Sequence, residues 1–195
     1  MEKKWNEVEP NFGHIFFTDL QTMGILKFLI SQNIDGLHLK SGIKEENLAE
    51  FHGNMTLVRC LECNKRHQKK GLWDSKIWGS GFRVEPVKEG QPICPDCGGR
   101  IINDIVNFGD SIPMDAIENS VKHSKQSDVF LVVGSSLTVT PAANMPIYAL
   151  DNGAKLIIIN HQETGYDNLA TIRFFESAGE TLIKILEKVK TMIKS

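Results

Sequence analysis

The sequence predicts an α/β protein, with a parallel sheet and a small inserted cysteine-rich lobe. Short runs of branched apolar residues, such as 128–133 and 154–159, alternate with longer helical patterns. This alternation is typical of a parallel sheet built from βαβ units. Two Cys-x-x-Cys pairs, separated by thirty residues, indicate the lobe. We therefore expect a sheet domain at 1–58 and 100–195, and the lobe at 59–99.

The helices and strands follow from the spacing of apolar residues. We predict a helix over 14–23 that ends at Gly24, and a buried strand over 25–30. Thr140 followed by Pro141 indicates another helix start, and Pro146 implies either a kink or a later beginning. Two further helices are expected over 114–124 and 180–194. The second has the predicted apolar stripe Leu182, Ile183, Leu186, Val189 and Ile193.

Composition excludes several classes of protein. The chain has 195 residues, of which 41% are hydrophobic, enough for a real core. A formal net charge of -2 gives no general attraction to nucleic acid or to acidic membranes. No apolar run is long enough to span a bilayer, and the polar start lacks the apolar segment of a signal peptide. We expect an intracellular protein of the cytoplasm or nucleus, without a membrane partner.

Polar residues gather directly after the first predicted strand. Gln32, Asn33 and Asp35 put two amides and a carboxylate within four residues. The carboxyl ends of parallel strands are where ligands bind in open α/β sheets, so this stretch predicts a functional site. Further on, His52 stands beside Gly53 after an apolar stretch, where an imidazole can act as a base near neutral pH.

The four cysteines have the spacing of a structural zinc site. Cys60 with Cys63 and Cys94 with Cys97 would supply four thiolates to one tetrahedral ion. A redox role for either pair is the alternative. Between the pairs, the basic run 65–70 is either a solvated face or a weak nucleic-acid contact. We expect Trp73, Trp78 and Phe82 to fill the lobe's core.

Three later segments are further site candidates. The loop Asn107–Pro113 either presents an open backbone edge to an extended peptide or caps the next helix. The turn after strand 128–133, with Gly134 and Ser136, suits a phosphate or a ribose. Polar residues from Asn160 to Gln162 end the next strand.

Together these segments resemble the sirtuin family of NAD-dependent protein deacylases. The resemblance rests on six stretches that occur in the family's order. They are Gln32–His38, Phe51–Gly53, the two cysteine pairs, Phe108–Pro113, Val133–Leu137 and Ile158–Asn160. The sequences of residues 31–42 and 48–55 are closest to the class IV nuclear branch.

The resemblance implies a Rossmann-like sheet, NAD as co-substrate, structural zinc and an acyl-lysine protein or peptide as partner, with histones among the candidates. It implies that His52 is the general base and that Asn33 and Asp35 line the nicotinamide pocket as catalytic residues. In this chemistry the acyl oxygen attacks the ribose, so no nucleophilic side chain is needed. Further cofactor contacts would come from Gln32, Gly134, Ser135, Ser136, Asn160, Gln162 and Ala178. Peptide contacts would come from Phe108, Gly109 and Asp110.

The family also carries, upstream of the region that matches Pro10, a Gly-Ala-Gly-x-Ser loop and a second cofactor loop that this sequence lacks. The resemblance therefore implies that the first strand-helix unit is missing and that NAD binding is weakened. Two alternatives stay open beside the deacylase. One is a non-catalytic, zinc-stabilised module that binds peptide or nucleotide, and the other is a nucleic-acid binder.

Overall fold

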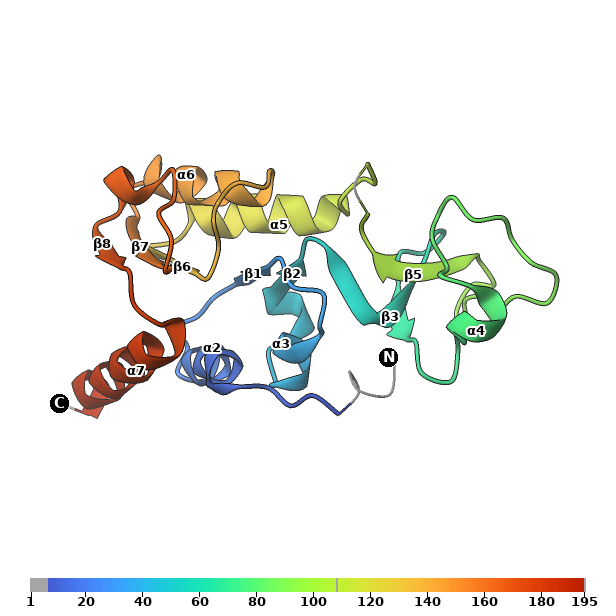
Figure 1. Ribbon diagram of the computed structural model, residues 1–195, viewed down its shortest axis with the longest axis horizontal. Helices are drawn as coiled ribbons and strands as arrows, with labels where there is room; N and C mark the ends of the chain where they lie inside the picture. Colours follow the sequence, from blue (N-terminus) through green and yellow to red (C-terminus); the bar gives the residue numbers. More distant parts are fainter. Residues whose placement is uncertain (1–6, 108, 195) are drawn as a thin grey trace. The chain divides into compact units, whose positions relative to one another are not determined.

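A computed structural model describes residues 7–107 and 109–194 of the protein (Figure 1). The chain divides into two compact units. The first contains the residues up to Ser31, then Leu37–Ala49, and the residues from Pro113 onward. The second contains Gln32–Gly36 and Glu50–Ile112, so the predicted lobe at 59–99 lies within it. None of the described helices is both long and apolar enough to cross a bilayer.

A parallel sheet forms the centre of the first unit and confirms the predicted α/β class. Its order is β6 (Val129–Val133), β7 (Lys155–Ile159) and β8 (Ile172–Phe174). β6 and β7 are the two apolar runs predicted as strands, whereas β8 was not predicted. Alternate residues serve opposite faces, as the two-residue period of a strand requires. Leu156 and Ile158 enter one core cluster, and Ile159 enters the other.

Helices cover both faces of this sheet. Two short helical segments, Ala142–Asn144 and α6 (Met145–Leu150), contribute to the core cluster around Val132 and Leu156. The helix α5 (Met114–Lys125) packs against α6. The helix expected at Pro141 therefore begins later. Pro146 lies in the first turn of α6, where its missing N–H is tolerated.

On the other face, α2 (Phe12–Thr22) packs against α7 (Ala178–Lys194) (Figure 1). The predicted stripe on α7 is partly wrong. Ile183 is 41% exposed because it lies about 100° around the helix from Leu182, whereas Ile185 joins the core instead. Ile193 is 59% exposed near the helix end. Leu182, Leu186 and Val189 pack as predicted.

The first predicted strand is shorter than expected. Only Leu29–Ser31 forms a strand, β1, which pairs with β2 (Leu48–Glu50). Gly24, at φ +72°, ends α2 as predicted, and the N–H groups of Ile25 and Leu26 then donate to the carbonyl of Leu20. The beginning of the apolar run therefore closes the helix end. Between β1 and β2 lie a short helix, α3 (Leu37–Lys40), and a 3-10 turn at Glu45–Asn47.

The second unit is an antiparallel sheet with long loops. β3 (Gly53–Cys60) lies between β4 (Arg66–Gln68) and β5 (Ile101–Ile105). A short helix, α4 (Ser75–Trp78), follows β4. The core contains Val58, Trp73 and Ile101 together with the buried thiols Cys60 and Cys94, and Trp78 packs against it. Phe82 is only half-buried and lies in the predicted loop between 79 and 91.

Candidate active site and zinc site

The polar loop Gln32–Gly36 is fastened to β3 at two points. The carbonyl of Ile34 accepts a hydrogen bond of 2.8 Å from the N–H of Met55. Gly36, at φ +73°, lies against the side chain of Asn54, where a Cβ atom would come within 2.9 Å of the amide oxygen. Only glycine combines this backbone conformation with this closeness. The loop therefore has a defined place in the second unit.

His52 reaches the same loop from a distant part of the sequence. Its Nδ1 lies 2.8 Å from the main-chain oxygen of Gln32. Because a carbonyl can only accept, Nδ1 must carry the proton, and the neutral ring keeps a lone pair on Nε2. The structure thus brings His52 to the predicted Gln32–Asp35 segment. Asn33 is exposed and Asp35 is half-buried.

The close contacts of Gly53 explain why a glycine follows His52. It lies at φ +80°, and a Cβ atom there would be 1.9 Å from the carbonyl oxygen of Asp104 on β5. The pairing of β3 with β5 shifts register just after Gly53, and the N–H of Val106 donates to the carbonyl of His52. The close contact between strands fixes the backbone from which the imidazole projects.

We expect Gly53→Ala to destabilise the second unit by more than the positive φ alone costs, which is about 1–3 kcal/mol. Either β5 or the backbone at His52 must move to make room for the new methyl group. Gly71→Ala is the matched control, because Gly71 has φ +82° with nothing within 4 Å of its Cβ position. Urea unfolding of both variants measures the difference. Equal losses would show that the contact with Asp104 is unimportant.

A buried ion-pair network that we did not predict connects strands β2, β3, β4 and β5. Arg66 binds both Glu50 and Asp104, and Arg59 donates to the other oxygen of Asp104 at 2.7 Å. Glu50 also accepts from Asn54 at 2.8 Å. Burial raises the pKa of Glu50, although Arg66 opposes this. The interpretation of 65–70 as a solvated face is therefore wrong at Arg66, whose side chain is 13% exposed.

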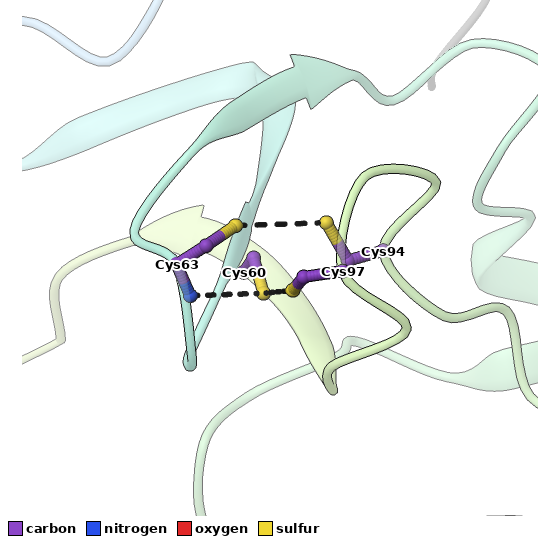
Figure 2. A group of neighbouring side chains, drawn as sticks. All are labelled: Cys60, Cys63, Cys94 and Cys97. Atoms are coloured by element: carbon purple, nitrogen blue, oxygen red, sulfur yellow. Dashed lines mark hydrogen bonds between the residues drawn. The ribbon is translucent and has the colours of Figure 1, made fainter.

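The four cysteines converge on one point in the second unit (Figure 2). Their sulfur atoms all lie within 4.8 Å of one another, with 3.5 Å between Cys60 and Cys97 and 3.7 Å between Cys63 and Cys94. Four sulfurs at 2.3 Å from a tetrahedral zinc ion would be about 3.8 Å apart. The donor set and spacing therefore fit zinc. None of these four cysteines forms a disulfide in the structure.

Main-chain N–H groups support the thiolates. Glu62 and Cys63 donate to Cys60, and Gly99 donates to Cys97. The N–H of Cys63 lowers the pKa of Cys60 to about 7, against the opposing effect of burial. His67, from the basic run, has its Nε2 3.4 Å from the sulfur of Cys94.

The loop predicted to bind peptide is described only in part, because Phe108 lies outside the described residues. Gly109 has φ +92°. Asp110 accepts hydrogen bonds from the N–H and the side-chain amide of Asn107, so it closes a turn. It does not cap α5, whose N-cap is Pro113.

The residues predicted to contact the phosphates and ribose of NAD lie in the first unit, and Gly134 and Asn160 directly follow the carboxyl ends of two paired strands. Val133 on β6 is in register with Ile159 on β7, and the N–H of Gly134 donates to the carbonyl of Ile159. Gly134 and Asn160 therefore leave the sheet side by side. The hydroxyl of Ser135 accepts from the N–H of Leu137, which has a left-handed backbone at φ +54°. The remaining predicted residues are Ser136, which contacts Thr138, Gln162 in the loop after β7, and Ala178 at the start of α7.

Arg173, on β8, was not predicted to take part, yet it holds the loop after β7. It donates to the carbonyls of Asn160 at 2.8 Å and Gln162 at 2.7 Å. Its Nε pairs with Asp167 at 2.8 Å. Hydrogen bonds from Thr164, together with Arg173, lower the pKa of Asp167.

The lowered pKa of Asp167 predicts a dependence of stability on acid pH. A carboxyl group with a lower pKa in the folded state stabilises the fold above its unfolded value, and that contribution disappears as the pH falls through the folded value. We expect the difference in melting temperature between the wild type and Asp167→Asn to shrink as the pH falls below about 4. Thermal unfolding from pH 6 to pH 2.5 measures it. A constant difference would contradict the assignment.

Comparison with known proteins identifies the chain. Residues 1–141 match the profile described as the Sir2 family. The chain belongs to the Sir2 family. A Sir2 relative from Caldivirga maquilingensis, named NAD-dependent protein deacetylase, is 38% identical over 185 residues, which are 95% of this chain and 67% of the relative. The NAD-dependent protein deacylase of Thermococcus sibiricus is 36% identical over 188 residues, 96% of this chain and 70% of that one.

Solved Sir2 structures agree with this assignment. One, described as Sir2 with a p53 peptide and NAD+, superposes with a TM-score of 0.76 at 30% identity and covers 96% of this chain and 73% of that chain. Another, which contains 2'-O-acetyl-ADP-ribose and a deacetylated p53 peptide, gives a TM-score of 0.74 at 30% identity, with coverage of 96% and 75%. The Rossmann-like fold is thus that of the Sir2 family, and the four-cysteine cluster is consistent with a zinc-binding lobe.

Proposed function

We propose that this protein removes acyl groups from lysine side chains of proteins and consumes NAD as it does so. The observation that carries the proposal is the hydrogen bond between Nδ1 of His52 and the carbonyl of Gln32. It joins two of the sequence marks of the family and leaves Nε2 of the imidazole as a base. Relatives named NAD-dependent protein deacetylases and deacylases, over about 95% of the chain, support the same reaction.

In this proposal each group of residues has one task. His52 takes a proton from a ribose hydroxyl at Nε2, and Asn33 and Asp35 line the nicotinamide pocket beside Gln32. Bound NAD supplies the electrophilic ribose carbon, so the chain needs no nucleophile of its own. The phosphate and ribose contacts of the first unit come from Gly134, Ser135, Ser136, Asn160, Gln162 and Ala178.

The four thiolates would hold zinc as a closed structural site. Sulfur would take all four tetrahedral positions of a bound zinc ion, which would leave no position open for a water or a substrate. Zinc would therefore stabilise the second unit without taking part in proton transfer. We propose that residues 59–99 form this inserted lobe within the NAD-binding domain at 1–58 and 100–195.

The partner would be an acyl-lysine protein, such as a histone, that adds as an extended strand at Phe108, Gly109 and Asp110. Solved relatives bound to acetylated and propionylated peptides support this class of partner. Nucleic acid is a weak partner at most, because Arg66 is occupied by Glu50 and Asp104, and Lys65 pairs with Asp96.

The amino-acid sequence of residues 31–42 supports placement of the chain in the class IV branch.

The experiment is to measure nicotinamide release from NAD with and without an acetyl-lysine peptide. The proposal predicts release that depends on the peptide and is accompanied by equal amounts of deacetylated peptide. The unacetylated peptide of the same sequence is the control. Peptide binding without any release would instead favour a non-catalytic binding module.

A further inference from the structure

We propose that Arg173 is a positioning residue for the adenosine end of NAD. It acts through the loop Asn160–Gln162, and the inference rests on the proposed function. The side chain of Arg173 is 11% exposed, and it points its guanidinium at the main chain of that loop. No motif of the sequence marked this residue.

The guanidinium donates hydrogen bonds to both ends of the loop Asn160–Gln162. One NH group donates to the carbonyls of Asn160 and Phe174, and the other donates to the carbonyl of Gln162. The aromatic ring of Phe175 lies 3.8 Å from the central carbon of the guanidinium. Asp167 holds the remaining nitrogen, Nε, at 2.8 Å. The guanidinium is thereby fixed by groups on two sides while it bridges the loop.

This bridge sets which atoms the loop can offer to a ligand. The side-chain Nδ2 of Asn160 donates to the carbonyl of Gln162 at 2.9 Å, the same oxygen that Arg173 binds. Oδ1 is the acceptor of this amide, and the hydrogen bond of Nδ2 to Gln162 sets the direction in which Oδ1 is offered to a ribose hydroxyl. The main-chain N–H of Asn160 is committed as well, to Phe174 on β8. Arg173 therefore determines the orientation of the predicted ribose acceptor.

Lysine cannot take over this task. A planar guanidinium presents five N–H donors in a rigid fork, whereas an ammonium group is a point charge with three donors on a flexible chain. A lysine side chain in place of Arg173 would keep the charge opposite Asp167, but it could not bond the loop carbonyls and Asp167 together. A purely electrostatic role would survive Arg173→Lys, and a positioning role would not.

The test measures the binding of ADP-ribose, which lacks nicotinamide, by titration calorimetry to Arg173→Lys and the wild type. We expect affinity to fall about tenfold, the effect of roughly one hydrogen bond to a ligand. The KM for NAD should rise by a similar factor, while kcat and the KM for acetyl-lysine peptide stay within about twofold. Arg83→Lys, at an exposed arginine of the second unit, is the matched control and should bind like the wild type.

A second variant keeps the test decisive if Arg173→Lys does not fold. Asp167→Asn leaves the guanidinium in place but removes its charged partner, and should lower ADP-ribose affinity about threefold. Unchanged affinity in the folded variants would overturn the inference. So would an equal loss for the acetyl-lysine peptide, since that would show a general structural effect. Failure of the wild type to bind ADP-ribose would instead count against the proposed function.

Discussion

Removal of zinc is expected to unfold the second unit. The thiols of Cys60 and Cys94 are buried in the same cluster as Val58, Trp73 and Ile101, so the ion would lie beside the core of this unit. Without the ion, four sulfur atoms within 4.8 Å of one another would have to lose their negative charge or separate. In small zinc peptides, structural zinc contributes about 10–16 kcal/mol of apparent binding free energy, which is as large as the total stability of a typical domain, about 5–15 kcal/mol.

Two measurements check this expectation. Metal analysis should find one zinc ion per chain, and a chelator should shift tryptophan fluorescence to the red, because Trp73 and Trp78 pack around the cysteine cluster. Cys94→Ser should behave like the chelated protein. Asp96→Asn is the matched control, because Asp96 lies between two ligands in the sequence and its carboxylate pairs with Lys65 at the surface. A chelated protein with unchanged fluorescence would show that the metal is not structural.

The sequence predicted those parts of the site whose residues lie close together in short motifs. The two Cys-x-x-Cys pairs converge as expected because a metal needs all four ligands within a few ångströms, whatever the spacer does. The sequence also singled out His52 beside Gly53, and the structure brings this histidine to the carbonyl of Gln32. The glycine makes room for the carbonyl of Asp104, and the histidine beside it reaches the polar loop.

The parts that could not be predicted depend on contacts between charged residues far apart in the chain. Arg66 looked like one member of a solvated basic run, and its partner Asp104 lies 38 residues away. Arg173 gave no signal either, because its partners include main-chain carbonyls, which every residue has. Hydrophobic periodicity carries no information about such pairs. The strands β2, β3, β4, β5 and β8 were not predicted. β2, β4 and β8 have only three residues each, and β3 and β5 mix polar with apolar side chains.

Replacing His52 should stop deacylation without unfolding the protein. Loss of a general base costs about 10²–10⁴-fold in rate. His52 is only half-buried, so His52→Ala should lower stability modestly, mainly through the lost hydrogen bond to the carbonyl of Gln32. We therefore expect the rate of peptide deacetylation to fall by about that factor while peptide binding stays within about twofold. His123→Gln is the control, because His123 stacks on Phe28 in the first unit.

A second substitution distinguishes the role of His52 as a base from its role as a hydrogen-bond donor to the carbonyl of Gln32. His52→Gln has an amide that can donate to the carbonyl of Gln32, as Nδ1 does in the wild type, but it has no basic nitrogen. If His52 only fastened the loop Gln32–Gly36, glutamine would restore much of the activity that alanine loses. If Nε2 takes the proton, the glutamine and alanine variants should be equally inactive, although the glutamine variant should regain stability. Deacetylation rates and urea unfolding of both variants decide between these roles.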